Sequence, residues 1–327
     1  MGNSILFLNK GPQAASSRYR ATMYQHHFEK AGWRFLELPC NDGFWARLKI
    51  LQRARQYRWV VIQRKLFGPI FLKLLKRANP NLVFDFDDAI FLKSSGQASK
   101  KRQRSFNRTM STIKQVWGGN RYLASHARTL GATSDVIPTA INIEKYVPTC
   151  FDNHDDNALT LIWIGSRSTR KYLKDFEATF EEIGEAIPGL TLLVVADFEF
   201  ALKNITVKNI PWSLESEQTS LNAADIGIAP MTDNPWTRGK CALKVLQYMA
   251  AGLPVVSSDS GANAEVITEG KTGYLGNTAE SWINAINTLK DKQHRAVLGR
   301  AGRKVVEQGF TTEICFDKML RSLNTHG

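Results

Sequence analysis

The sequence predicts an α/β fold made of two Rossmann-like domains, each a doubly wound parallel sheet. Three observations support this prediction. Short apolar runs of about four to eight residues alternate with longer helical patterns along the whole chain. These runs are nearly continuous, which is typical of parallel strands buried on both faces. The length of 327 residues suits two domains of about 150 residues each.

The expected elements follow one another as alternating strands and helices. In the first half we expect strands at 4–8, 34–38, 59–62, 82–86, 115–118 and 134–137. In the second half we expect them at 160–164, 190–196, 207–210, 226–229 and 254–257. Helical periodicity marks 17–31, 68–77, 171–185, 240–251 and 312–323. A polar run with Pro148 predicts a linker at 147–157 between domains at 1–148 and 158–311.

The composition is that of an ordinary globular protein, 43% hydrophobic and 22% charged, which excludes disordered and collagen-like chains. No apolar run reaches the roughly 18 residues that span a bilayer, and the first residues resemble a strand more than a secretory signal. The cysteines are scattered, so we expect reduced thiols in the cytoplasm and no metal site.

Charge divides the chain unevenly. Residues 1–150 carry 25 Lys and Arg against 8 Asp and Glu, whereas residues 151–327 carry 18 against 22. The basic residues gather at 44–58, 70–77 and 100–104, the last expected to be a loop. Basic amphipathic helices with aromatic residues suit an anionic membrane surface. The alternatives are ordinary sheet-packed helices with solvated lysines, or nucleic acid as a partner, for which the sequence shows no recognition motif.

The segment 236–258 contains the most informative candidate functional residues. It predicts a loop, a helix that begins near Lys240 and is stopped by Gly252, and a buried strand from Pro254. Lys240 and Lys244 would then share one helical face beside the unpaired amides of the first turn. Such an arrangement can hold a diphosphate. The alternative is an ordinary helix–strand unit with solvated lysines.

At this segment the sequence resembles a known family. The run MAAGLPVVSS, with KCALKVLQY before it and SGANAEVITEGKTGYL after it, resembles the donor-binding segment of retaining glycosyltransferases of family 4. Other matching stretches follow in order: GPQAASSRYRATMYQHHFEKAGW, IPTAINIEKY, LIWIGSRSTRKYL and LNAADIGIAPM. The resemblance implies GT-B architecture, with two Rossmann-like domains facing across a cleft. It also implies a nucleotide-sugar co-substrate, no metal or other cofactor, and a final segment, 312–327, that packs back on the first domain.

The chain departs from the family's usual Glu-x7-Glu motif. Aligned on MAAG, the second position falls on Gln247 and the first on Gly239, next to Lys240. The resemblance assigns Gln247 to the nucleotide ribose, which an amide can hydrogen-bond without the strength of a carboxylate. A branch of the family with a Lys-Cys-x-x-Lys-x-x-Gln-Tyr motif fits these residues, and a non-catalytic homologue is the alternative.

A second donor element follows the strand at 160–164. Gly165, Ser166, Arg167 and Lys171 join this strand to a helix, where backbone amides can face a phosphate. The family places an Arg after the Gly and a Lys five residues later. Here Ser166 takes the Arg position, with Arg167 beside it, and Lys171 matches the Lys.

A turn further along the chain resembles another donor contact of the family. In the run SGANAE, residues 260–265, the resemblance places Asn263 toward the donor. Glu265 has two interpretations, a donor contact or a cap on its own helix.

In the first half, three carboxylates stand at the carboxyl end of the strand at 82–86. Ligands bind at such ends in doubly wound sheets, which favours acceptor contact or proton transfer by Asp87 or Asp88. Two alternatives remain: a DxD metal site, or an Asp that pairs with an Arg for structural reasons.

The first loop, 11–20, is expected to border the same edge. Ser17, Arg18 and Arg20 would contact an anionic acceptor or the donor phosphates, although Ser16 or Ser17 as a helix N-cap is a plainer interpretation. His126 is expected to be a surface or packing residue.

The sequence therefore predicts a glycosyltransferase that moves a sugar from a nucleotide-sugar donor to a glycan or lipid-linked acceptor, with retention of configuration and without a metal. The second domain would hold the donor, and the basic first domain would hold the acceptor. The protein would be peripheral to the inner face of the cell membrane. The alternatives are a GT-B epimerase acting on nucleotide sugars, a non-catalytic homologue and a nucleic-acid-binding protein.

Overall fold

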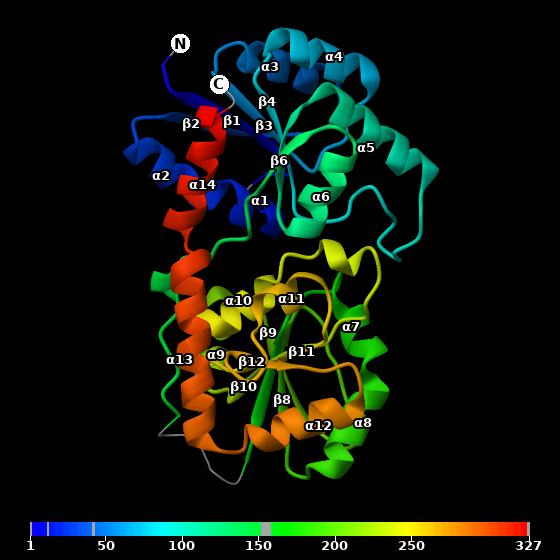
Figure 1. The fold of residues 1–327 in the computed structure, drawn as a ribbon, viewed down its shortest axis with the longest axis vertical. Helices are drawn as coiled ribbons and strands as arrows, with labels where there is room; N and C mark the ends of the chain where they lie inside the picture. Colours follow the sequence, from blue (N-terminus) through cyan, green and yellow to red (C-terminus); the bar gives the residue numbers. More distant parts are fainter. Residues whose placement is uncertain (1, 12, 41–42, 152–157, 326–327) are drawn as a thin grey trace. The chain divides into compact units, whose positions relative to one another are not determined.

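Each half of the chain builds one six-stranded parallel sheet (Figure 1). The computed structural model describes residues 2–11, 13–40, 43–151 and 158–325. They form two units: unit 1 comprises Met1–Ala140, Asn234–Cys241 and Thr312–Gly327, and unit 2 comprises Ile141–Asp233 and Ala242–Thr311. The predicted α/β fold class with two parallel sheets is confirmed.

The division into units differs from the predicted domain boundary in two ways. The first segment of unit 1 ends at Ala140, before the predicted linker, and Thr149 donates a backbone hydrogen bond to Ala251 within unit 2. Residues 152–157 of that linker lie outside the described residues. In addition, the short segment Asn234–Cys241 belongs to unit 1, although the chain on either side of it belongs to unit 2.

The sheet of unit 1 has the order β2-β1-β3-β4-β5-β6. Its order reverses between β1 and β3, which is the position where doubly wound sheets bind ligands. Alternate residues of each strand enter opposite cores, because successive side chains of a strand point to opposite faces. Leu6, Val60 and Phe84 thus enter one core, and Ile5 and Trp59 the other. The strands are β1 (Ser4–Asn9), β2 (Arg34–Pro39), β3 (Trp59–Gln63), β4 (Leu82–Phe86), β5 (Gln115–Gly118) and β6 (Thr133–Val136).

Two groups of helices complete these cores. The first core receives α3 (Phe44–Ala54), α4 (Pro69–Ala78), α5 (Lys100–Thr112) and α6 (Arg121–Thr129). The second core receives η1 (Thr22–Tyr24), α2 (Gln25–Lys30) and α14 (Thr312–Thr325), and α1 (Ala15–Arg20) precedes them. Helix α14 thus packs on unit 1, where the Ser322 hydroxyl accepts a hydrogen bond from the indole of Trp117.

Two predicted elements of unit 1 are wrong. The expected helix at 17–31 is interrupted, because Ala21 lies outside helical geometry at φ −137° and ψ −65°. The basic stretch at 100–104 is the first turn of α5, and not a loop, since Ser99 caps this helix by accepting from the Arg102 amide.

The sheet of unit 2 has the order β12-β11-β10-β7-β8-β9, with its reversal between β7 and β10. Its strands are β7 (Thr160–Ile164), β8 (Thr191–Ala196), β9 (Thr206–Pro211), β10 (Ile226–Ala229), β11 (Val255–Ser257) and β12 (Gly273–Leu275). Its longer helices are α8 (Glu177–Ala186), α9 (Leu214–Asn222), α10 (Leu243–Ala250), α12 (Ala279–Thr288) and α13 (Lys292–Gly309). Shorter turns are η2 (Ile143–Lys145), α7 (Arg170–Asp175) and α11 (Gly261–Val266). Strand β12 is not among the predicted strands.

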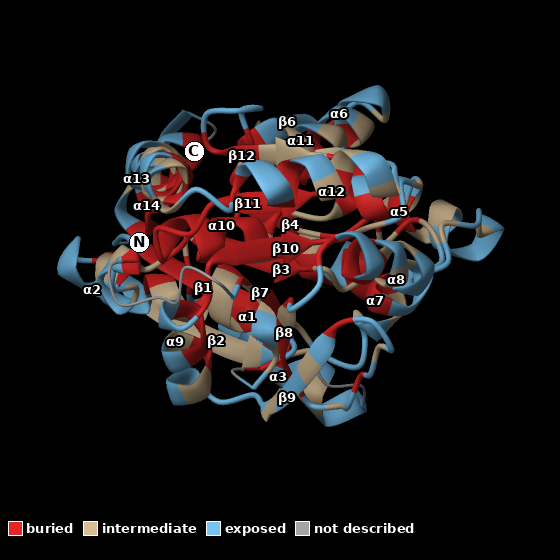
Figure 2. Cartoon of the chain, turned by 90° about the horizontal axis from the view of Figure 1, so that it is seen from below, coloured by how far each residue is buried: buried red, intermediate tan, exposed pale blue. Residues whose placement is uncertain are grey.

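Burial follows the sheets, whose central strands are buried while the outer helix faces are exposed (Figure 2). Within the residues that the structure describes, no helix is both long enough and apolar enough to cross a membrane.

Candidate functional site

The carboxyl edge of the unit 1 sheet contains a buried ion pair. Arg20 and Asp85 are both completely buried, and the Arg20 guanidinium donates to both carboxylate oxygens of Asp85 and to the carbonyls of Ile137 and Pro138. Burial alone would lower the pKa of Arg20, but the charge and hydrogen bonds of Asp85, together with the charge of Asp87, outweigh it and the net shift is upward. Arg20 therefore holds the sheet and its loops together, and the predicted acceptor contact by Arg20 is wrong.

The neighbouring Asp88 binds two cations at once. One of its oxygens accepts from Arg64, and the other accepts from the Lys240 ammonium at 2.7 Å. Arg64 also lies 3.4 Å from Asp87, measured from Nε to Oδ1. Arg64 follows β3 with φ +59°, an uncommon backbone conformation for a residue other than glycine.

This pairing favours the structural interpretation for Asp85 and Asp88. The carboxylates of both residues bind arginines of the same unit. Among the described residues, no group of three or more His, Cys, Asp or Glu side chains could hold a metal ion.

Lys240 reaches Asp88 because the segment 234–241 is seated on unit 1. The Asn120 amide donates to the carbonyls of Arg238 and Lys240 at 2.9 and 2.8 Å. A Cβ on Gly239 would lie 2.7 Å from the backbone nitrogen of Ala89, so only glycine allows this approach. The Cys241 thiol lies 3.4 Å from the Asp87 carbonyl, and its pKa is raised by burial and by the charges of Asp87 and Asp88.

The backbone of the segment 234–241 shows that the predicted helix start at Lys240 is wrong. Lys240 has an extended backbone (φ −74°, ψ 148°), Ala242 has a left-handed backbone (φ +53°), and α10 begins at Leu243. Lys240 and Lys244 therefore do not share a helical face. In unit 2, the Lys244 ammonium lies 5.0 Å from the centre of the Trp163 ring, a cation–π distance.

The first loop is also arranged differently from the prediction. Helix α1 begins at Ala15, so neither Ser16 nor Ser17 is its N-cap, and Ser17 is buried. Arg18 lies in the last turn of this helix and is half-buried. His126 stacks on Phe91 with ring centres 3.9 Å apart, which confirms its packing role; burial lowers its pKa.

In unit 2, the predicted phosphate loop lies at the switch point between β7 and β10. The loop amides have partners within the protein: Ser166 donates to the Thr169 hydroxyl and Arg167 donates to Asp197 at 2.7 Å. The Arg167 side chain is 80% exposed, and its Nε lies 3.7 Å from Asp197 Oδ2. This ion pair is weak, because both side chains are exposed to solvent. Lys171 is half-buried in α7, with its ammonium 5.0 Å from the Tyr172 ring centre.

Serine and asparagine side chains follow the adjoining strands. Asn263 is buried and donates to the Ser257 hydroxyl at 3.0 Å, while Ser258 accepts from the Met231 amide. Glu265 lies beyond the first turn of α11, whose N-cap residue is Ser260, so it does not cap this helix. Asn263 thus joins α11 to the end of β11.

Gln247 lies in a buried network that sequence reasoning missed. Its amide nitrogen donates to Glu217 Oε1 at 2.8 Å and lies 3.2 Å from the Tyr146 hydroxyl. Glu217 Oε2 accepts from the Trp212 indole at 2.8 Å, and the Glu217 residue is only 7% exposed. The sequence feature that could have indicated this network is Glu217 itself, a carboxylate on the inner face of α9 four residues after the N-cap residue Ser213.

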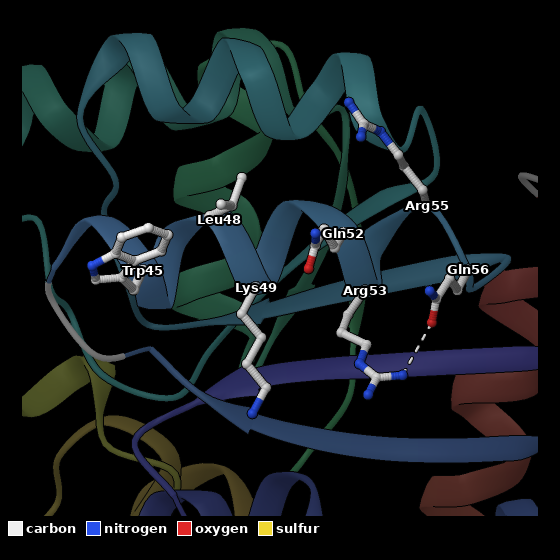
Figure 3. Close-up of a pocket in the computed structure, with 7 residues that line it drawn as sticks. All are labelled: Trp45, Leu48, Lys49, Gln52, Arg53, Arg55 and Gln56. Atoms are coloured by element: carbon white, nitrogen blue, oxygen red, sulfur yellow. Dashed lines mark hydrogen bonds between the residues drawn. The ribbon is translucent and has the colours of Figure 1, made fainter.

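A basic and apolar surface covers α3 and α4 of unit 1, and we call it the α3–α4 surface. Phe44, Trp45 and Ile70 are 72–77% exposed, which is unusual for large apolar side chains. The α3 part is hollowed, and Figure 3 shows Lys49 and Arg53 extending to the same side of the helix. The exposed cations of this surface are Arg47, Lys49, Arg53, Lys73 and Arg77.

Comparison with known proteins assigns the second unit. The profile of the family Glycosyl transferases group 1 matches residues 158–292. These residues are therefore similar to the group 1 glycosyltransferase family. A curated relative, N-acetyl-alpha-D-glucosaminyl L-malate synthase of Bacillus anthracis, is 29% identical over 161 residues, which cover 47% of this chain and 42% of the relative. The chain spans less than half the length of the curated relatives that it matches.

Solved structures extend the likeness to the whole fold. Sucrose-phosphate synthase of Thermosynechococcus elongatus superposes with a TM-score of 0.75 at 15% identity, covering 99% of this chain and 100% of the other. The Anabaena protein HepE, in complex with UDP and glucose, superposes with a TM-score of 0.71 at 14% identity, covering 98% and 99%. The segment that matches the group 1 family therefore lies in a chain with the GT-B fold.

Proposed function

We propose that this protein is a retaining, metal-independent glycosyltransferase that uses a nucleotide-sugar donor. The observation that supports the proposal best is the group 1 domain at 158–292, whose candidate phosphate loop lies at the switch point of its sheet. The complex of HepE with UDP and glucose shows a nucleotide in a protein of the same fold.

In the proposed donor site, Lys171 and Arg167 bind the diphosphate. Charge builds up on the diphosphate oxygens as the glycosidic bond loosens, and nearby cations stabilise it. Helix α7 is short and the amides of Ser166 and Arg167 already have partners, so the cations carry this function. Arg167 can exchange the exposed carboxylate of Asp197 for a phosphate at little cost.

A panel of UDP-, GDP- and ADP-sugars tests the donor assignment, since a bound ligand raises the melting temperature. At least one member should stabilise the protein, and Lys171→Ala should weaken that binding about tenfold. Lys208→Ala removes an exposed charge from the edge strand β9 and serves as the matched control. Unchanged binding in Lys171→Ala would remove Lys171 from the site. Retention is tested by the anomeric configuration of the product in NMR spectra.

Unit 1 is the proposed acceptor unit. Asp88 is saturated by Arg64 and Lys240, so its proposed contribution is to hold these cations in place. Asp87 is the better candidate for acceptor contact, because its side chain is 16% exposed. Asp87→Asn should lower kcat while leaving donor binding unchanged; an equal loss of donor affinity would contradict this role.

We further propose that the acceptor is a glycan or a lipid-linked glycan, and that the α3–α4 surface binds an anionic membrane. Its exposed apolar side chains can enter the lipid interface while its cations contact acidic headgroups. The net charge of +17 on residues 1–150 attracts the same headgroups.

Flotation with liposomes tests the surface. The protein should float with phosphatidylglycerol liposomes at low salt, stay behind with neutral liposomes, and be released at high salt. Trp45→Ser/Ile70→Ser should reduce flotation severalfold. The control Leu214→Ser/Val297→Ser removes exposed apolar side chains from unit 2. Equal flotation of both double variants, or equal binding to neutral lipid, would count against the proposal.

A further inference from the structure

Four charged side chains at the carboxyl edge of the unit 1 sheet bind one another. Asp88 accepts from Arg64 and from Lys240, and Arg64 Nε lies 3.4 Å from Asp87 Oδ1. The four side chains are 10–28% exposed, so solvent reaches the group although most of it is covered. The group joins two cations to two carboxylates, and all four belong to unit 1.

This pairing differs from the charge of the chain around it. Residues 43–134 contain 19 Lys and Arg, three Asp and no Glu, and the three Asp lie in β4 or directly after it. Asp85 is completely buried against Arg20. Asp87 and Asp88 are therefore the carboxylates that this basic stretch presents to solvent, and each is already beside a cation.

Arg64 reaches this position through an unfavourable backbone. It follows β3 at φ +59°, a left-handed conformation that residues other than glycine avoid, and its amide donates to the Asp85 carbonyl at 2.8 Å. Burial alone would lower the pKa of Arg64, but neighbouring charges, those of Asp87 and Asp88 foremost, outweigh it and the pKa is raised. Backbone strain at a ligand-binding edge of a sheet points to a function for the side chain that it places.

The paired charges decide which chemical groups can bind beside them. A phosphate or carboxylate that approached Arg64 would displace Asp87 or Asp88 and leave a largely covered charge without its partner. A cation would in the same way displace Arg64 or Lys240 from the carboxylates. A neutral hydroxyl requires no such exchange, because it can donate to a carboxylate and accept from a cation while the ion pairs persist.

We propose that these four side chains form an acceptor subsite for an uncharged, hydroxyl-bearing sugar, and that Arg64 sets this selectivity. Asp87, the more exposed carboxylate, accepts from the sugar hydroxyl, and Arg64 balances its charge. The inference rests on the proposed function and deepens it by naming the substrate class of the acceptor unit. The class refers to the sugar that receives the transferred residue, and not to anionic groups elsewhere in the acceptor.

The relative use of neutral and anionic acceptors tests the inference. The probes are octyl glucoside, galactoside and mannoside and the octyl uronides of the same configurations, each offered with the nucleotide sugar that stabilises the protein most. The measured quantity is the ratio of kcat/KM for each neutral glycoside to that for its uronide, from which any loss of folded protein cancels. The wild type should favour the neutral member at least about tenfold. Equal use of both members, or preference for the uronide, would overturn the inference.

Changing one charge at a time should move this ratio in opposite directions. Arg64→Gln leaves an excess of negative charge and should raise the preference for the neutral glycoside about tenfold. Asp87→Asn leaves an excess of positive charge and should lower the preference about tenfold. Arg64→Lys retains the charge, so its ratio should stay within about threefold of the wild type.

Arg58→Gln is the matched control, because Arg58 directly precedes β3 and lies at the opposite end of the strand from Arg64. It changes the net charge of the protein by the same amount and should leave the ratio unchanged. A merely structural role of Arg64 would lower stability in Arg64→Gln without moving the ratio. Equal ratios in Arg64→Gln and Arg58→Gln would therefore overturn the inference.

Three further outcomes keep the inference separate from the proposed function. If no nucleotide sugar stabilises the wild type, the proposed function fails and the inference fails with it. If a nucleotide sugar binds but none of the octyl glycosides accepts a sugar, the inference fails while the proposed donor site stands. If Arg64→Gln does not fold, the comparison of Arg64→Lys with Asp87→Asn replaces it, and equal ratios in these two variants would overturn the inference.

Discussion

The carboxyl edges of the two sheets carry charge in opposite ways. In unit 1 the cations are internal: the Arg20 side chain is fully buried, and Arg64 and Lys240 both bind Asp88. In unit 2 the Arg167 side chain extends into solvent, 80% exposed. Charges that are buried and paired hold a structure together, whereas exposed charges can change partners. The comparison shows that an edge rich in charged residues is not by itself a binding site.

The largest effect is expected from breaking the buried pair of unit 1. Arg20→Met leaves the Asp85 carboxylate buried without its counter-charge and should lower the free energy of unfolding by about 3–5 kcal/mol. Denaturant titration measures the loss. The double variant Arg20→Met/Asp85→Leu removes both charges and should recover much of the stability. A loss below about 1 kcal/mol in the single variant would show that the pair is not structural.

A smaller effect is expected at Asp88. Asp88→Asn removes the negative charge that binds Arg64 and Lys240, and should cost about 2 kcal/mol. It should also loosen the segment 234–241, so that Cys241 is alkylated faster than in the wild type. In the wild type, the exposed Cys150 should react first, because the pKa of Cys241 is raised. Unchanged protection of Cys241 in Asp88→Asn would mean that Asp88 does not hold the segment.

Gly239→Ala tests how closely the segment 234–241 packs against Ala89, without changing any charge. The added methyl group would meet the Ala89 backbone at 2.7 Å, and we expect a loss of about 1–2 kcal/mol together with faster hydrogen exchange in 234–241. Gly189→Ala is a useful contrast, because no atom lies near its Cβ but its φ of +86° disfavours alanine. Equal exchange in 234–241 for wild type and Gly239→Ala would argue against close packing there.

The smallest effect on stability is expected in unit 2. Arg167→Ala removes an exposed and loosely paired cation and should change the free energy of unfolding by less than about 0.5 kcal/mol. The same variant should weaken binding of nucleotide diphosphates by a similar factor for every base. This loss of affinity should shrink as salt is added, because salt screens the interaction that the variant lacks. A large loss of stability would place Arg167 with the structural charges of unit 1, and would remove the contrast between the two edges.

Much of the fold could be predicted because local patterns report it directly. The apolar runs marked eleven of the strands that the structure contains, since a parallel strand must be apolar on both faces. Strand β12 was missed because it is a three-residue strand, too short for a pattern. The helix ending at Ala250 was predicted at its C-terminus by Gly252, but not at its N-terminus, since the left-handed Ala242 leaves no signal in the sequence.

The sequence by itself determined the α/β fold, the two sheets and the location of charged residues at strand ends, because each depends on neighbours along the chain. Only the tertiary structure decided what those charges do. Asp85 and Arg20 are far apart in sequence, as are Asp88 and Lys240 and Glu217 and Gln247, yet each pair is joined by a hydrogen bond. Whether a charged side chain is paired in the interior or exposed to a ligand depends on such distant partners, and no local pattern encodes them.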